Sequence, residues 1–155
     1  MREALKEAQK AYDLDEVPIG AVIVKDGQII ARGHNLRERE QNPILHAEMV
    51  AIYRAAQKVK SWRLTGCEIY VTIEPCPMCA GALIQGRLDR VIFGARDPKA
   101  GCTGSLYNLV QDNRFNHRLE VIEGILEEDC RQIIKDFFRR KRQKKPSLID
   151  INLEK

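Results

Sequence analysis

The residues best suited to chemistry are two cysteines, Cys76 and Cys79, together with His46 and Glu48 further upstream. Two thiolates three positions apart at the start of a helix can bind one metal ion, and an imidazole can supply a third ligand. Three protein ligands leave one position of a tetrahedral zinc open, as a catalytic zinc requires. The spacing therefore predicts one catalytic Zn²⁺ per chain, bound by His46, Cys76 and Cys79, with Glu48 transferring protons beside it.

The cysteine pair alone does not select zinc. A strand followed by Cys-x-x-Cys at a helix start is also typical of thioredoxin-type redox sites, where the helix terminus lowers a thiol pKa. A four-cysteine structural site is excluded because Cys67, Cys102 and Cys130 are scattered and form no second pair. His46 favours zinc, since it opens an apolar segment that carries Glu48 two positions later. Burying a charged carboxylate among apolar side chains costs free energy, so a functional role for Glu48 is the better interpretation.

The histidine and the glutamate lie where a helix is expected to begin. Residues 34–45 are polar and read as a loop, and the residues from Ala47 to Ala56 are apolar on nearly all sides. This pattern predicts a helix that is buried all round and lies against a sheet. His46 and Glu48 can reach one centre only if His46 sits at the helix entrance, before the regular turns begin.

The cysteines lie at the second such junction. Residues 67–73 have β-branched and aromatic character and predict a central strand that runs directly into the motif. Pro77 suits the first position of a short helix, and Gly86 suits its end. Two helix N-termini are therefore expected to converge on the metal, and their positive ends would stabilise thiolates.

The remaining pattern predicts further strands and helices around these junctions. Asp26-Gly27 between two apolar runs is a strong hairpin signal, and a connection as long as 95–116 is typical of functional loops. Alternating strands and helices indicate an α/β protein, a three-layer α/β/α sandwich with a central mixed five-stranded sheet. The elements expected are helices at 2–14 and from 127 to about 142 (with Ile133, Ile134, Phe137 and Phe138 as its apolar positions), and strands at 17–24, 28–33, 90–94 and 119–122.

Composition limits the class of protein. A chain of 155 residues with 44% hydrophobic residues is expected to form one domain, residues 1–145, followed by a weakly ordered tail at 146–155. No apolar run approaches the roughly twenty residues that span a bilayer, and the charged N-terminus lacks the core of a signal peptide. Five cysteines, an odd number, favour a reducing compartment, so a cytoplasmic protein without membrane contact is expected.

The net charge of +4 is modest, but residues 139–145 hold six cations in seven positions. Such a run is either a solvated helix end or the electrostatic footprint of a nucleic-acid contact. Both interpretations remain open at this point.

The metal-site residues also carry a resemblance. His46-Ala47-Glu48 followed by Pro75-Cys76-x-x-Cys79 is the known signature of zinc-dependent nucleobase deaminases. Similarity to the bacterial tRNA-specific adenosine deaminases, the TadA family, extends over nearly the whole chain to Gln143. The central motif is shared with cytosine, guanine and deoxycytidylate deaminases, whereas the segments after Phe93 favour tRNA. The segments that carry the resemblance are 17–21, 33–35, 46–48, 74–82, 93–97, 104–106, 116–118, 123–126 and 137–139.

The resemblance implies a cytidine deaminase-like fold and a homodimer that converts adenosine to inosine at the wobble position of an arginine tRNA. Its partner would be the tRNA anticodon arm, and Glu48 would be the catalytic residue. The residues implied to contact the substrate are Asn35, Ala47, Pro75, Asp97, Lys99, Phe138, Arg139 and Arg142. Pro98 and Cys102 depart from the family pattern within the loop expected to contact the substrate.

Two other functions stay open. A deaminase of a small nucleobase or nucleoside would keep the same metal site without needing the basic helix. A nucleic-acid-binding or redox module would instead form a disulfide between Cys76 and Cys79.

Overall fold

The centre of the molecule is a five-stranded sheet with the strand order β2-β1-β3-β4-β5. The computed structural model describes residues 1–144. Strand β1 is antiparallel to both β2 and β3, whereas β3, β4 and β5 run parallel, so the sheet is mixed as predicted. The strands are β1 (Gly20–Lys25), β2 (Gln28–His34), β3 (Cys67–Ile73), β4 (Arg90–Ala95) and β5 (Glu120–Ile122).

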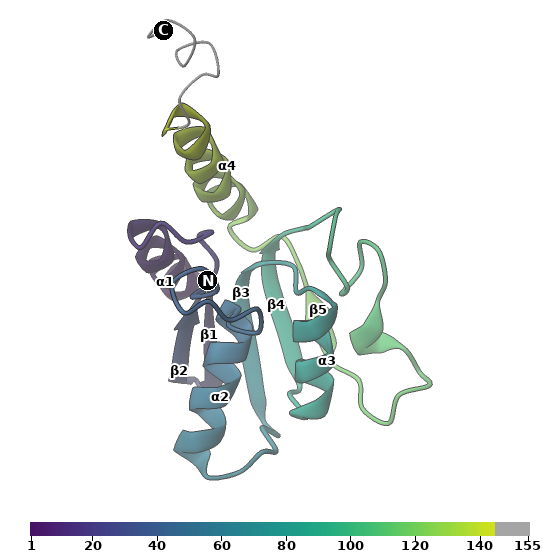
Figure 1. The fold of residues 1–155 in the computed structure, drawn as a ribbon. Helices are drawn as coiled ribbons and strands as arrows, with labels where there is room; N and C mark the ends of the chain where they lie inside the picture. The colour runs from purple at the N-terminus through teal and green to yellow at the C-terminus, as the bar shows by residue number, and fades with distance from the viewer. Residues whose placement is uncertain (145–155) are drawn as a thin grey trace, which may run out of the picture.

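Helices cover both faces of this sheet, which confirms the predicted three-layer sandwich (Figure 1). Helices α2 and α3 lie side by side on one face, with the short helix η1 beside α3. Helices α1 and α4 contact each other and pack on the strands from the opposite side. The helices are α1 (Arg2–Asp13), α2 (Ala47–Val59), α3 (Pro77–Gln85), η1 (Leu109–Gln111) and α4 (Glu127–Lys144).

The hairpin between β1 and β2 turns at Asp26 and Gly27, whose φ values of 51° and 74° are those of the expected tight turn. The strand predicted at 17–24 is wrong at its start, because β1 begins only at Gly20. Pro18 has no N–H for a ladder, and the Val17 carbonyl accepts a hydrogen bond from the Asn35 side chain instead. Val17 and Ile19 therefore lie outside the sheet and line a small cavity beside His46.

The first turn of α2 is held directly against β2 at Gly33. A Cβ atom at this position would lie 2.7 Å from the Ala51 nitrogen and would overlap the Ala47 carbonyl oxygen. Ala47 and Ala51 are themselves fully buried. This close approach fixes where the helix begins, and so fixes the positions of the residues that open it.

The prediction that α2 is buried on all sides is wrong for its outer face. Ala47, Val50, Ala51 and Ala55 face the sheet, but Tyr53 is 65% exposed. Apolar composition alone could not reveal this, because no other element among the described residues covers the outward side of the helix.

Helix α4 is also less buried than its apolar positions suggested. Phe137 is buried, with its ring edge-on to Tyr12 at a centroid distance of 5.8 Å, whereas Phe138 is 43% exposed. The tail predicted at 146–155 lies outside the described residues. Within residues 1–144, no helix combines the length and the apolar character needed to cross a membrane.

Candidate active site

The three predicted metal ligands lie at two helix starts. His46 is the N-cap of α2, with extended backbone angles (φ −75°, ψ 156°), and Cys76 is the N-cap of α3 (φ −73°, ψ 175°). Pro77 occupies the first turn of α3, and Cys79 follows on the buried side of that helix. Both N-termini converge on one point, as the sequence predicted, so their dipoles favour negative ligands there.

The donor atoms have the spacing of a tetrahedral site. The Nδ1 atom of His46 lies 3.5 Å from the Cys76 Sγ and 3.6 Å from the Cys79 Sγ, and all three donors lie within 4.8 Å of one another. Zinc bonds of about 2.05 Å to nitrogen and about 2.3 Å to sulfur place N and S about 3.6 Å apart at the tetrahedral angle. One imidazole and two thiolates in this arrangement fit zinc.

Glu48 lies beside these donors in the first turn of α2. Its side chain is 3% exposed, and its Oε2 accepts a hydrogen bond from the Cys79 thiol at 3.3 Å. Burial raises the pKa of the Glu48 carboxyl to about 7. A group that titrates near neutral pH can both accept and return a proton.

The two thiols differ in acidity. A hydrogen bond from Cys79, assisted by His46, lowers the pKa of Cys76 to about 4. The pKa of Cys79 is raised by its hydrogen bond to Cys76 and by burial, and the pKa of His46 is raised by its contact with Cys76. Metal binding would release protons here, because thiolate and neutral imidazole are the ligand forms.

A small cavity of about 90 Å³ opens beside His46. Asn35 is nearly buried in its wall, where its Nδ2 donates to the Val17 carbonyl at 3.3 Å and its Oδ1 accepts from the Arg37 backbone N–H at 3.2 Å. Ala47 lies in the same wall, as predicted. The remaining lining residues, Val17, Ile19 and Arg37, were not predicted from the sequence. For Val17 and Ile19 a signal was available, because Pro18 between them has no N–H to donate and so marks a segment that cannot continue the strand.

The loop after β4 is tied to the metal-ligand motif. The Pro75 carbonyl accepts a hydrogen bond from the Cys102 N–H at 2.8 Å. The Asp97 carboxylate accepts from the backbone N–H groups of Lys99 and Ala100, at 3.0 and 3.2 Å. Asp97 therefore shapes the turn that presents Lys99.

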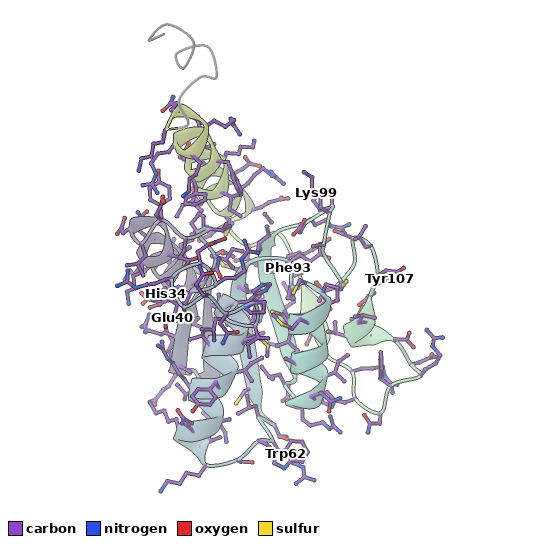
Figure 2. All side chains as sticks on the ribbon, in the orientation of Figure 1. His34, Glu40, Trp62, Phe93, Lys99 and Tyr107 are labelled. Carbon is purple, nitrogen blue, oxygen red and sulfur yellow. The ribbon has the colours of Figure 1, made fainter. Side chains whose placement is uncertain are left out.

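Lys99 and α4 together form a cationic groove. The groove measures about 550 Å³, and Lys99 lies toward the α4 end of the molecule, whereas Trp62 lies at the opposite end (Figure 2). The structure thus brings together four of the residues predicted to contact the substrate, none of which lines the small cavity beside His46. The residues that line the groove are Lys99, Ile134, Lys135, Phe138, Arg139 and Arg142.

Comparison with known proteins agrees with this geometry. Residues 1–142 match the MafB19-like deaminase family. The tRNA-specific adenosine deaminase of Bacillus subtilis (strain 168) is 57% identical over 145 residues, which cover 94% of this chain and 90% of that protein. This chain belongs to the tRNA-specific adenosine deaminase family.

Solved structures extend the comparison to the fold. A structure from a study of A-to-I editing by tRNA:A34 deaminases at the wobble position of transfer RNA superposes with a TM-score of 0.83. It is 40% identical, and the match covers 86% of this deaminase and 96% of that chain. The guanine deaminase of Bacillus subtilis is 38% identical with a TM-score of 0.59, and that match covers 61% of each chain.

The basic run of this deaminase is divided between two tasks. Arg140 donates to the Tyr12 carbonyl and to Asp15, both at 3.1 Å, and its guanidinium lies 4.1 Å above the Tyr12 ring. Lys141 pairs with the same Asp15 at 2.5 Å. These two cations fasten α4 to the end of α1, so the run as a whole is not one solvated or RNA-facing surface. Among residues 1–144, Arg142 makes no ion pair and faces the groove.

Proposed function

We propose that this protein is a zinc-dependent deaminase that hydrolyses adenosine to inosine at the wobble position of a tRNA anticodon, in an arginine tRNA. The observation that carries the proposal is the buried Glu48 carboxylate beside a three-donor set with tetrahedral spacing. Membership of the family supports the choice of adenosine in tRNA as the substrate. Five unpaired cysteines, all within the described residues, suit a reducing compartment such as the cytoplasm.

His46, Cys76 and Cys79 would hold one Zn²⁺. When bound, zinc acts as a Lewis acid and lowers the pKa of a coordinated water to about 7. The three side chains fix its position because each is held at a helix start against the sheet.

Glu48 moves the protons of the reaction. Its carboxylate takes a proton from the attacking water and delivers it to the neighbouring ring nitrogen. It then takes the second proton from the new hydroxyl at C6 and delivers it to the departing amine, which leaves a C6 carbonyl. The water oxygen bonds to C6, the C6–N6 bond breaks, and ammonia leaves. Burial raises the pKa of the Glu48 carboxyl, which favours its holding a proton between the two transfers.

The surrounding residues would orient the nucleotide and exclude water. Asn35, whose amide groups are fixed by Val17 and Arg37, would hydrogen-bond the target nucleoside. Ala47 and Pro75 would form the walls against the base. An anticodon loop suits this site because its bases are largely unstacked already, so little energy is needed to expose one of them.

The neighbouring nucleotides would lie in the cationic groove. Lys99, Arg139 and Arg142 supply positive charge for phosphates, and the exposed ring of Phe138 offers a surface on which a base can stack. A deaminase of a small free base, such as the guanine deaminase of similar structure, would have no use for this groove.

The protein would act as a homodimer. The outer face of α2 and the loop before it form an apolar depression of about 540 Å³, with Ile44 50% exposed and Tyr53 65% exposed. A second copy seated here would bury these side chains. It would also brace the segment that ends at His46.

The test is Glu48→Gln, assayed on a tRNA anticodon stem-loop. The variant should retain one zinc per chain and bind the RNA normally, while turnover falls by about two to four orders of magnitude because the acid–base group is lost. Near-normal turnover would remove Glu48 from the reaction, and loss of zinc would give it a structural role instead.

A further inference from the structure

Another buried carboxylate near the metal-ligand motif lies at the carboxyl end of β3. Glu74 directly precedes the Pro75-Cys76 motif, is 2% exposed, and was not among the predicted site residues. A buried charge is costly unless hydrogen bonds satisfy it. Its own N–H donates to the Ala95 carbonyl at 2.8 Å, which fixes its backbone to the end of β4.

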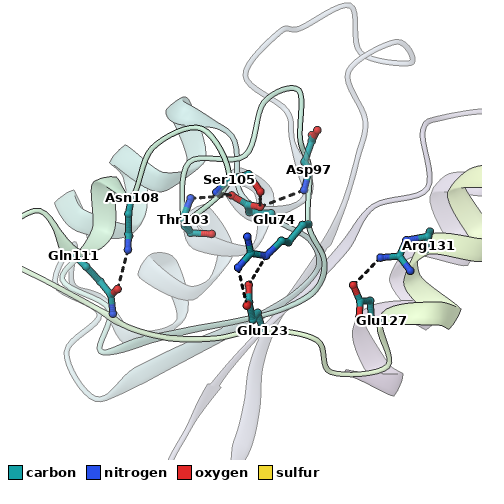
Figure 3. A network of polar contacts seen from close by, with 10 residues as sticks. Glu74, Asp97, Thr103, Ser105, Asn108, Gln111, Glu123, Glu127 and Arg131 are labelled. Atoms are coloured by element: carbon teal, nitrogen blue, oxygen red, sulfur yellow. Dashed lines mark hydrogen bonds and ion pairs between the residues drawn. The ribbon is translucent and has the colours of Figure 1, made fainter.

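The Glu74 side chain is satisfied by the loop that follows β4 (Figure 3). Its Oε1 accepts from the backbone N–H of Asp97 at 3.2 Å and from the hydroxyl of Ser105. Its Oε2 accepts from the backbone N–H groups of Thr103 and Ser105, at 3.1 and 3.0 Å. One carboxylate thus gathers both ends of the segment 97–105.

The loop approaches this carboxylate at Gly101. A Cβ atom there would lie 2.6 Å from the Asp97 carbonyl oxygen and would overlap the Glu74 carboxylate. Only a residue without a side chain allows the loop to close over Glu74 in this way. The contact between the loop and β3 therefore depends on both the Glu74 carboxylate and the absence of a side chain at Gly101.

We infer that Glu74 is a positioning residue for RNA recognition: it fixes the segment 97–105 to the metal-ligand motif and so places Lys99 beside α4. This inference rests on the proposed function, in which Lys99 contacts the nucleotides that flank the target base. Asp97 shapes the turn that carries Lys99, and the N–H of Asp97 is itself held by Glu74.

Replacing Glu74 by glutamine tests this role with little change in size. An amide can keep one oxygen as an acceptor, but its NH₂ group must then face N–H donors or the Ser105 hydroxyl. The matched control is Glu123→Gln, which alters an exposed carboxylate that accepts twice from Arg96 near the same loop. Gly101→Ala breaks the same contact from the loop side, so it carries the test if the Glu74 variant does not fold.

The first measurement is hydrogen exchange of the peptide 97–105 in the zinc-loaded protein without RNA. In Glu74→Gln, exchange should accelerate by about tenfold or more at the N–H groups that face the new NH₂, which are either that of Asp97 or those of Thr103 and Ser105. In Gly101→Ala, exchange should accelerate at all three, because the added methyl group displaces the carboxylate from the loop. It should stay unchanged in Glu123→Gln. Unchanged exchange in the first two variants would overturn the positioning role, whatever the substrate of the enzyme.

The second measurement compares an anticodon stem-loop with free adenosine. In Glu74→Gln, KM for the stem-loop should rise about tenfold while kcat stays within about threefold and zinc content is unchanged. Free adenosine, which has no flanking nucleotides to contact Lys99, should be affected far less. Equal losses on both substrates, or loss of zinc, would mean that Glu74 merely supports the metal motif. Failure of the wild type on the stem-loop would instead count against the proposed function.

Discussion

Salt dependence should separate the cations that contact RNA from those that hold α4 in place. The groove presents Lys99, Lys135, Arg139 and Arg142. Arg139 also pairs with Asp136 of its own helix at 2.9 Å, but both side chains are exposed, so a phosphate can replace this partner. Each neutralised phosphate of a single strand contributes about −0.7 to the log–log slope of affinity against salt, so four contacts give about −2.8. That slope corresponds to about a fiftyfold loss of affinity between about 50 and 200 mM salt. If all six cations of 139–145 bound phosphates, the slope would be about −4.2 and the loss about three hundredfold.

Two neighbouring arginines make the decisive pair of variants. Arg142→Gln should reduce the magnitude of the slope by about 0.7, because its charge faces the groove. Arg140→Gln should leave the slope unchanged, since this guanidinium is held by Tyr12 and Asp15. It should instead lower stability by about 1 kcal/mol, because the guanidinium loses its cation–π contacts with Tyr12 and Phe137 and its surface ion pair with Asp15. The melting temperature would then fall by about 2–4 °C.

The assay is fluorescence anisotropy of a labelled anticodon stem-loop, titrated at several salt concentrations. All proteins should carry Glu48→Gln, so that the RNA is not converted during the titration. Equal effects of Arg140→Gln and Arg142→Gln on the slope would refute the division of the basic run into anchor and groove. Binding insensitive to salt would remove the groove as a phosphate site.

Three further outcomes follow from the same structure. After zinc removal, iodoacetamide at about pH 6 should alkylate Cys76 before the other cysteines, because its pKa is about 4 and thiolate is the reactive form. Bound zinc should protect Cys76 from the reagent. Mass spectrometry of the peptides measures the order of alkylation, and faster alkylation of another cysteine would contradict the prediction. Tyr53→Glu should yield monomers in sedimentation experiments, because a carboxylate would be buried in the proposed dimer contact; an unchanged sedimentation coefficient would place the dimer contact elsewhere. The hydrogen bond from Lys141 lowers the pKa of Asp15 below its ordinary 3.8, so the α4 anchor should be intact above pH 3.8 and weaken as the pH falls through the lowered pKa; an NMR titration of Asp15 with an ordinary midpoint would contradict this.

The clustering of His46, Cys76 and Cys79 was predictable because its determinants are local. His46 and Cys76 each follow a segment of different character and open a helix, so residue type and position along the chain were sufficient. The hairpin was equally local, since Asp26-Gly27 specifies its own turn. The mixed sheet followed from the alternation of strands and helices.

What the sequence did not reveal depends on contacts between distant segments. Glu74 takes its donors from residues 23 to 31 positions downstream, and Arg140 finds Asp15 across 125 positions. No spacing rule anticipates such pairings. The exposed Tyr53 is a related case, because an apolar side chain on a helix does not reveal whether its cover comes from the same chain or from a second copy.

The central claim is tested most directly by a comparison of substrates. The zinc-loaded protein is incubated side by side with transcribed arginine tRNA, other tRNAs, and free adenine, guanine and cytosine; inosine is then measured by nuclease digestion with mass spectrometry, and ammonia is measured in solution. We expect inosine at the wobble position of the arginine tRNA, one ammonia per inosine, and neither product with Glu48→Gln. Ammonia released from a free base, with the tRNA left unchanged, would contradict it.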